Sequence, residues 1–254
     1  MSRDWPEQLR NNVFQTGNSM TPIHRSQARP FDLFKSLSDV DLDHILASAA
    51  VRTIAKDEAV FRQGEAAEAF FVLIHGRLKV TRTTADGQQI IVRFVVPGEL
   101  FGIAKAIGRR HYPGTAAAVL ESGVLAWNSS LWDELAVRHP SFAAKALAVV
   151  GERFLDAQTR LEEISTEDAE RRIAHAVLRL VHQAGRRVEQ GILIDFPIRR
   201  QDIAEMSGTT LHTVSRCLSA WEQAGWVEGG RQRLLVRDAH RLFALAEGKT
   251  ADPG

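Results

Sequence analysis

The chain has 254 residues, of which 44% are hydrophobic and 25% charged, and its formal net charge is +1. This length accommodates two domains with separate cores, and no apolar run reaches the roughly 18 residues needed to span a bilayer. The single cysteine, Cys217, excludes an internal disulfide framework and an iron–sulfur cluster held by four thiolates. The N-terminus lacks the continuous apolar core of a signal peptide, so we expect a cytoplasmic protein with no membrane partner.

The N-terminal part of the chain, residues 1–30, is polar and shows no sustained hydrophobic periodicity. This composition predicts an arm. The segment SLSDVDLDHILASA that follows predicts a short helix, because Leu42 and Ile45 share one face. Ser36 or Ser38 is expected to cap that helix.

Residues 31–140 are predicted to form a β-rich domain. Glycines at positions 64, 76, 87 and 98 recur every 11 or 12 residues, with short apolar runs between them. Short strands separated by turn residues at this interval indicate an all-β sandwich or barrel. The Asp-Gly pair within 85–89 is typical of a hairpin turn, and one further strand is expected within 114–128.

Residues 141–165 are predicted to form a long helix with a narrow apolar seam. The seam residues follow the 3-4-3-4-3 spacing of a coiled coil: Leu147, Val150, Phe154, Ala157, Leu161 and Ile164. A helix packed only on its own domain would need a wider apolar stripe, so the seam predicts a homodimer. Ser165 or Thr166 is expected to cap the next helix, at the start of a C-terminal domain over 166–254.

Residues 198–227 have the spacing of a helix-turn-helix. Ala204 permits close approach of two helices, Gly208 supplies a turn with positive φ, and Val214 packs inward ten residues after Ala204. Thr209 or Thr210 is expected to cap the second helix. The segment GWVEGGRQRLLVRD that follows predicts a strand–turn–strand wing, which completes a winged helix.

The second helix of this motif begins with hydrogen-bonding side chains on its outward face. Three of them, at i, i+3 and i+4, are predicted to read base edges in the major groove: His212, Ser215 and Arg216. Three further residues are predicted to contact the phosphates, which position a protein on DNA: Arg200, Thr210 and Thr213. Double-stranded DNA is therefore the predicted partner. The alternative is a helical pair that serves only as a protein-interaction surface.

The order of these segments resembles the Crp/Fnr superfamily of bacterial transcription regulators. The resemblance rests on VFRQGEAAEAFFVLIHGRLKV (60–80), DGQQIIVRFVVPGELFG (86–102) and RRQDIAEMSGTTLHTVSRCL (199–218). It implies an α+β fold: an N-terminal β-roll of the cyclic-nucleotide-binding, jelly-roll type, a long dimerisation helix and a C-terminal winged helix-turn-helix. It also implies RNA polymerase as a partner. The sequence has no metal-ligand cluster, phosphate loop or nucleophile motif, so we expect no catalytic residue and no enzyme.

Members of that superfamily that bind cyclic AMP place a Glu, an Arg and a Ser or Thr around the phosphate and ribose. The corresponding positions here are Ile103, Gly114 and Thr115. The ribose acceptor and the bidentate phosphate partner are therefore lost, and cyclic AMP is not expected to bind. The effector-pocket region that the resemblance assigns comprises Gly102, Ile103, Tyr112 and Thr115.

The stretches TTLHTVSR (209–216) and YPGTA (112–116) are similar to nitric-oxide-responsive denitrification regulators of the NNR/DNR type. This resemblance implies haem b as the nitric oxide sensor, and activation of denitrification genes at Fnr-like TTG…CAA palindromes. No haem ligand transfers by motif, and His24 and His111 are the candidates because they lie on the arm and beside the pocket region. At the reading face, His212 replaces the Glu that is usual in Fnr-type proteins.

Cys217 on the second helix has two interpretations. It is either a small apolar residue behind the reading face or a redox switch beside the DNA. Two functional alternatives also stay open. One is a FixK-like regulator that needs no ligand, which a β-roll packed with its own side chains would favour, and the other is an adaptor that does not bind DNA.

Overall fold

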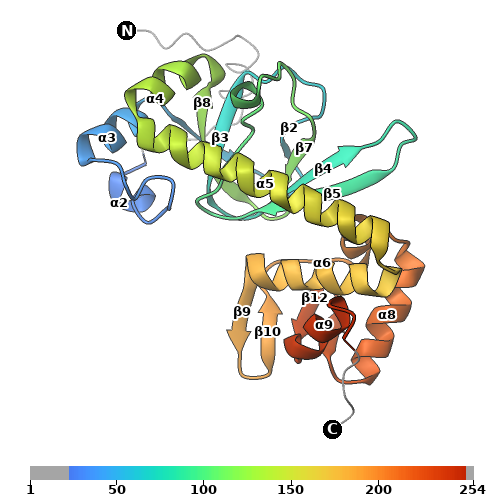
Figure 1. Cartoon of the computed structure of the whole chain (residues 1–254). Coiled ribbons are helices and arrows are strands. Elements are labelled where there is room, and N and C mark those ends of the chain that lie inside the picture. Colours follow the sequence, from blue (N-terminus) through green and yellow to red (C-terminus); the bar gives the residue numbers. More distant parts are fainter. Residues whose placement is uncertain (1–22, 250–254) are drawn as a thin grey trace. The chain divides into compact units, whose positions relative to one another are not determined.

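A computed structural model of the protein describes residues 23–249, and the chain divides into two units. The first unit comprises the residues up to Val80 together with Val95–Arg153. The second comprises Thr81–Phe94 together with the residues from Phe154 onward. The division falls inside the long helix α5 (Pro140–Thr166), so it differs from the predicted boundaries after residues 140 and 165 (Figure 1).

The first unit is built on two four-stranded sheets, which confirms the predicted β-roll. One sheet has the antiparallel order β1 (Ala50–Ile54), β8 (Ser122–Asn128), β3 (Ala69–His75) and β6 (Leu100–Phe101). The other has the order β2 (Ala59–Phe61), β7 (Thr115–Ala118), β4 (Leu78–Thr83) and β5 (Gln89–Val95), and most of its β4–β5 hairpin, Thr81–Phe94, belongs to the second unit. The expectation of one strand within 114–128 is wrong, because the chain turns at 119–121 and passes from one sheet to the other.

Tight turns join the strands at the four glycines that the spacing singled out. Gly64, Gly76, Gly87 and Gly98 all have positive φ angles, from 83° to 91°. At Gly76 a Cβ atom would lie 2.3 Å from the Ser122 hydroxyl, so only glycine fits where this turn approaches β8. The Asp-Gly turn is confirmed by the Gly87 N–H, which donates to the carbonyl of residue 84 at 3.0 Å.

A hydrophobic cluster joins the first sheet to the helices of this unit. The helical elements are α2 (Arg25–Ala28), α3 (Asp39–Ala47), η1 (Lys105–Ile107), η2 (Ser129–Leu131), α4 (Trp132–Arg138) and the start of α5. Ser38 caps α3 as expected, because its hydroxyl accepts a first-turn N–H at 3.1 Å. Ala28 is fully buried in the cluster beside Phe34 and Trp127, so the end of the predicted arm, residues 23–30, is ordered and packs on this unit. The rest of the predicted arm lies outside the described residues.

The junction between α5 and α6 (Ala169–Ala184) differs in detail from the prediction. Ser165 and Thr166 do not cap α6, because both hydroxyls donate to carbonyls one turn earlier within α5, at 2.7 and 2.8 Å. Asp168 is the cap instead. Its backbone is extended, and its carboxylate accepts a first-turn N–H of α6 at 3.0 Å.

The second unit is a winged helix in which α6 packs against three shorter helices. These are α7 (Arg200–Ser207), α8 (Leu211–Gln223) and α9 (Ala239–Ala246). Its sheet has the order β11 (Val227–Gly230), β12 (Arg233–Val236), β10 (Gly191–Ile194) and β9 (Gly185–Val188). The wing prediction is confirmed by β11 and β12, whereas the β9–β10 hairpin that extends the wing into a four-stranded sheet was not predicted.

Candidate functional site

The turn between α7 and α8 has the geometry that the spacing predicts. Gly208 ends α7 with φ of 62°, and the next N–H donates to the Ala204 carbonyl at 3.1 Å. Ala204 and Val214 are 2% and 0% exposed, so the two helices meet through a small residue and an inward-facing one. Thr210, one of the two expected caps, holds the start of α8 because its hydroxyl accepts the Thr213 N–H at 3.1 Å.

The face of α8 that is predicted to read bases is directed to solvent. His212 and Arg216 are exposed, and Ser215 is half-buried. The opposite face is buried in the core of the unit through Val214, Cys217, Leu218 and Trp221. The fold therefore brings the three predicted readers together on one accessible side of the helix, which is the arrangement that a major-groove helix needs. Their contacts with individual bases stay a prediction.

The residues predicted to contact phosphates are in two different situations. Thr210 is exposed and Thr213 half-buried at the start of α8, with their hydroxyls 2.9 Å apart. Arg200, at the first turn of α7, is already engaged. Its guanidinium lies 3.1 Å from the Glu222 carboxylate near the end of α8. The sequence analysis missed Glu222, because nothing local links two residues that only folding brings together.

Two further arginines of the wing are neutralised within the protein. Arg233 and Arg237 both pair with Glu228 on β11, the former at 3.0 Å. Hydrogen bonds from Arg237 and Arg233 hold the pKa of the Glu228 carboxyl below its ordinary value. In the part of the chain that the structure describes, Arg216 and Arg231 are exposed cations of this face without a carboxylate within 4.0 Å.

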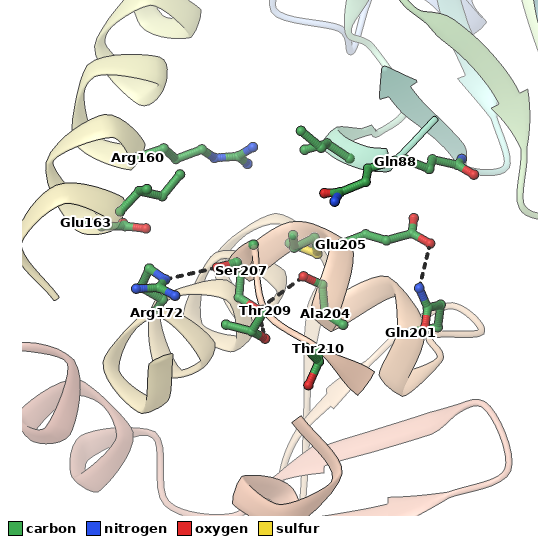
Figure 2. A pocket seen from close by; sticks show the side chains of 15 residues that line it. Gln88, Arg160, Glu163, Arg172, Gln201, Ala204, Glu205, Ser207, Thr209 and Thr210 are labelled. Carbon is green, nitrogen blue, oxygen red and sulfur yellow. Dashed lines mark hydrogen bonds between the residues drawn. The ribbon is translucent and has the colours of Figure 1, made fainter. Parts of the chain in front are cut away.

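A cavity of about 550 Å³ lies in the second unit beside the α7–α8 turn (Figure 2). Its lining comes from that turn, from the last turns of α5 and from the tip of the β4–β5 hairpin. Arg172 donates to the Ser207 carbonyl at 3.1 Å, and Gln201 donates to the Glu205 carboxylate at 3.1 Å. The cavity therefore borders the segment that sets the direction of α8.

Cys217 lies on the inner face of α8 and is 7% exposed. Burial raises the pKa of its thiol, and the neighbouring Glu170 adds to the shift. A buried thiol with a raised pKa forms little thiolate, which is the reactive species. This position supports the packing interpretation over the redox switch.

The predicted dimer seam on α5 is divided between two environments. Phe154, Leu161 and Ile164 are 60–66% exposed, Leu147 is 72% exposed, and Ala157 is also exposed. Val150 is half-buried and packs against the cluster of the first unit. The seam from residue 154 onward is thus an apolar strip that no described part of the chain covers.

The predicted effector-pocket region of the β-roll is filled by the protein's own side chains. Tyr112 is 5% exposed, and its ring stacks on Phe61 with centroids 3.8 Å apart. Its hydroxyl donates to the Ala69 carbonyl at 2.6 Å and accepts the Ala69 N–H at 3.2 Å. A Cβ atom at Gly102 would lie 2.8 Å from the Phe71 ring, so the aromatic packing reaches the second predicted position as well.

The other two positions of this region are also engaged. Ile103 is 6% exposed and belongs to the cluster of the first sheet. The Thr115 hydroxyl accepts the Gln63 N–H at 3.0 Å. All four predicted residues therefore take part in packing or backbone hydrogen bonds.

The two candidate haem ligands, His24 and His111, are both exposed. His24 caps α2, where its Nδ1 accepts the Ser26 N–H at 3.3 Å. His111 is exposed and forms an isolated β-bridge with Ala66. Tyr112, the neighbour of His111 in the sequence, is buried and stacks on Phe61. A role of either histidine as a haem ligand stays a prediction.

Two protein families match this chain. The family described as Cyclic nucleotide-binding domain matches residues 51–139, and the one described as Crp-like helix-turn-helix domain matches residues 171–245. None of the described helices has the length and apolar character that crossing a membrane requires.

Individual relatives match over most of the chain. It is 30% identical over 216 residues to the Cyclic AMP receptor protein of Thermus thermophilus, covering 85% of this chain and 97% of that one. It is 28% identical over 214 residues to the Transcriptional activator protein FnrA of Stutzerimonas stutzeri, covering 84% and 86%. The structure of FixK2 from Bradyrhizobium japonicum superposes with a TM-score of 0.68 at 25% identity, covering 80% of this chain and 98% of that one.

Proposed function

The chain belongs to the Crp/Fnr family of DNA-binding transcription regulators, and we propose that it acts as a homodimer that binds palindromic DNA without a small-molecule effector. It is not an enzyme, since its relatives are transcription regulators. The observation that carries the proposal is the accessible face of α8. That face carries His212, Ser215 and Arg216, and the opposite face of the helix is buried in the core.

Specific recognition follows from the chemistry of that face. The Arg216 guanidinium can donate two hydrogen bonds to a guanine, a contact worth about 1–3 kcal/mol of discrimination against another base. His212 and Ser215 supply shorter side chains that hydrogen-bond neighbouring bases. We infer that Fnr-like TTG…CAA half-sites are the targets, with RNA polymerase recruited beside them. The denitrification genes that the TTLHTVSR stretch suggests stay a prediction.

The exposed strip on α5 supports the homodimer. Phe154, Leu161 and Ile164 repeat at coiled-coil spacing and are each at least 60% exposed. Covering these three side chains on each of two copies contributes on the order of 10 kcal/mol before the entropy of association is subtracted. A two-fold axis along this helix would direct the two α8 helices at successive major grooves, about 34 Å apart.

The filled β-roll supports DNA binding without an effector. Tyr112 and its stacked neighbours occupy the interior where the effector region was predicted. The Glu and Arg that hold cyclic AMP in relatives are replaced here by Ile103 and Gly114. This is the FixK-like alternative. The opposing hypothesis, nitric oxide sensing through haem b, stays a prediction that the same preparation tests.

The experiment uses full-length protein purified anaerobically and dialysed free of small molecules. Fluorescence anisotropy with a TTG…CAA duplex should show the same affinity alone, with cyclic AMP and with haem plus nitric oxide. Arg216→Ala is the control for specific readout. A requirement for either effector, or a stoichiometric haem absorption band that shifts with nitric oxide, would contradict effector-free binding. Failure to bind any palindrome at low salt would instead favour the adaptor.

A further inference from the structure

We propose that Glu163 is a positioning residue that fixes the winged helix on the end of α5 and so sets the spacing of half-sites that the homodimer accepts. The inference deepens the proposed function and rests on it, because half-site spacing matters only to a dimer on a palindrome. A regulator that binds without an effector has to hold its two reading helices at one separation by its own contacts. The last turns of α5, which carry the exposed seam, and the helix α6 supply those contacts within the second unit.

Glu163 forms a buried ion pair between these two helices. One terminal nitrogen of Arg179, on α6, donates to both carboxylate oxygens of Glu163, on α5, at 2.6 and 2.9 Å. The Glu163 side chain is 7% exposed and the Arg179 side chain 21%. Separating such a pair leaves an uncompensated buried charge, which is strongly unfavourable even where the intact pair adds little to stability. The pair therefore favours one arrangement of α5 and α6 over others.

A second carboxylate, four residues after Glu163, makes a further contact with α6. Glu167, in the turn that follows α5, lies 3.2 Å from His175 Nε2 and 3.1 Å from a terminal nitrogen of Arg171. These two partners and Arg179 recur every four residues along α6, so they lie on one face of that helix. A single contact would let α6 pivot on α5, whereas two contacts hold it against rotation.

The charge of Glu163 also offsets a repulsion between two arginines at this junction. Burial lowers the pKa of Arg160, one turn earlier on α5, to about 10, and the positive charge of Arg179 adds to the shift. The Glu163 carboxylate acts in the opposite direction and stabilises the charged Arg160. Without that carboxylate charge, repulsion between the two guanidinium groups would favour the separation of α6 from α5.

Two hydrogen bonds connect α6 to the helices of the DNA-binding motif. Arg172 donates to the Ser207 carbonyl at the end of α7 at 3.1 Å (Figure 2). The indole N–H of Trp221, on α8, donates to the carboxylate of Glu170, on α6, at 3.0 Å. Because α6 also packs against both α7 and α8, a change in its direction turns the reading helix with it.

The consequence for recognition is a restricted spacing of half-sites. One additional base pair between two half-sites moves the second by about 3.4 Å along the duplex and rotates it by about 35°. A dimer with a fixed α5–α6 junction loses contacts at the displaced half-site, whereas a dimer with a loose junction still reaches it. Glu163 therefore acts on the choice of spacing and not on the readout of a single half-site.

The test measures the affinity of full-length protein for TTG…CAA duplexes whose spacers differ by one base pair each, by fluorescence anisotropy. A duplex with a single half-site is titrated at higher protein concentration. The starting protein should prefer one spacer over its neighbours by about tenfold, an effect similar to that of a mismatched base pair. Glu163→Gln should reduce this preference several-fold and leave the affinity for the single half-site unchanged.

Glu162→Gln is the matched control, because it removes the same charge from an exposed neighbouring position of α5, and it should keep the starting preference. Arg179→Lys keeps the positive charge without the guanidinium, and should broaden the spacing preference even if Glu163→Gln fails to fold in circular dichroism. The proposal is overturned if the folded variants keep the starting preference, if neither variant folds, or if single half-site affinity falls as much as palindrome affinity. If the starting protein binds no duplex of the series, the proposed function itself fails.

Discussion

Replacing Tyr112 by Phe tests whether the interior of the β-roll is closed by its own side chains. The change keeps the ring that stacks on Phe61 and removes only the hydroxyl that bonds to both backbone groups of Ala69. Ala69 is 1% exposed, so water cannot replace the lost partner. Leaving buried polar groups unsatisfied costs about 1–3 kcal/mol, and we expect the free energy of unfolding near neutral pH to fall by that amount.

The pH dependence of the free energy of unfolding provides a second, independent prediction for the same side chain. Burial raises the pKa of Tyr112 from 10.0 to about 12, because the phenolate is disfavoured in the apolar interior. The folded state therefore favours the neutral phenol. This contribution is complete below pH 10 and is lost as the pH rises from 10 to 12. A difference of this size corresponds to about 2–3 kcal/mol, which the starting protein should lose over that interval and Tyr112→Phe should not.

The assay is direct because the chain contains one tyrosine. The ultraviolet absorption of tyrosinate during an alkaline titration of the folded protein therefore reports Tyr112 alone, and urea unfolding of both proteins gives the free energies. A titration midpoint near 10 in the folded protein would show that the hydroxyl is in water. In that case the interior is open, and the argument for effector-free binding fails.

Four further changes test the winged helix and the dimer. Gly208→Ala places a side chain at φ of 62° and should lower the free energy of unfolding by about 1–2 kcal/mol in urea; an unchanged value would contradict the turn geometry. Thr210→Ala removes the cap of α8 and should cost about 0.5–2 kcal/mol in the same assay, with Thr210→Ser as the conservative control. Leu161→Glu places a charge on the exposed seam and should convert dimers to monomers in analytical ultracentrifugation, whereas persistent dimers would locate the interface elsewhere. Arg216→Ala should weaken operator binding by about 1–3 kcal/mol without changing binding to scrambled DNA, and an equal loss on both would make Arg216 a phosphate contact.

Local patterns predicted the parts of the fold that local chemistry determines. The Ala204, Gly208 and Val214 spacing specified the helix-turn-helix, because each residue type meets a steric demand at its own position. The glycine turns of the β-roll follow from the same principle. The Ser38 cap was correctly included among two candidates for similar reasons.

Features that depend on distant contacts or on competing local choices were missed. Ser165 and Thr166 looked like caps, but α5 extended over them and Asp168 took that position. The run over 114–128 reads as one strand, because no glycine or proline marks the bend at 119–121. The hairpin formed by β9 and β10 depends on pairing with β12, more than 40 residues along the chain.

In the candidate site, too, local features could be predicted from the sequence and long-range contacts could not. The reading face of α8 could be derived from helical periodicity alone. The partner of Arg200 could not, since Glu222 lies 22 residues away and reaches it only when α7 packs against α8. The filling of the β-roll by Tyr112 depends likewise on Phe61 and Ala69, which come from separate strands.

The central claim is that two copies of this chain bind one palindromic site without an effector. Native mass spectrometry of the dialysed full-length protein, mixed with a TTG…CAA duplex, measures this directly. We expect a complex of two chains and one duplex with no additional mass, and no such complex on a duplex with one half-site removed at the same concentration. A complex with one chain per duplex, or one that forms only after a small molecule is added, would contradict the claim.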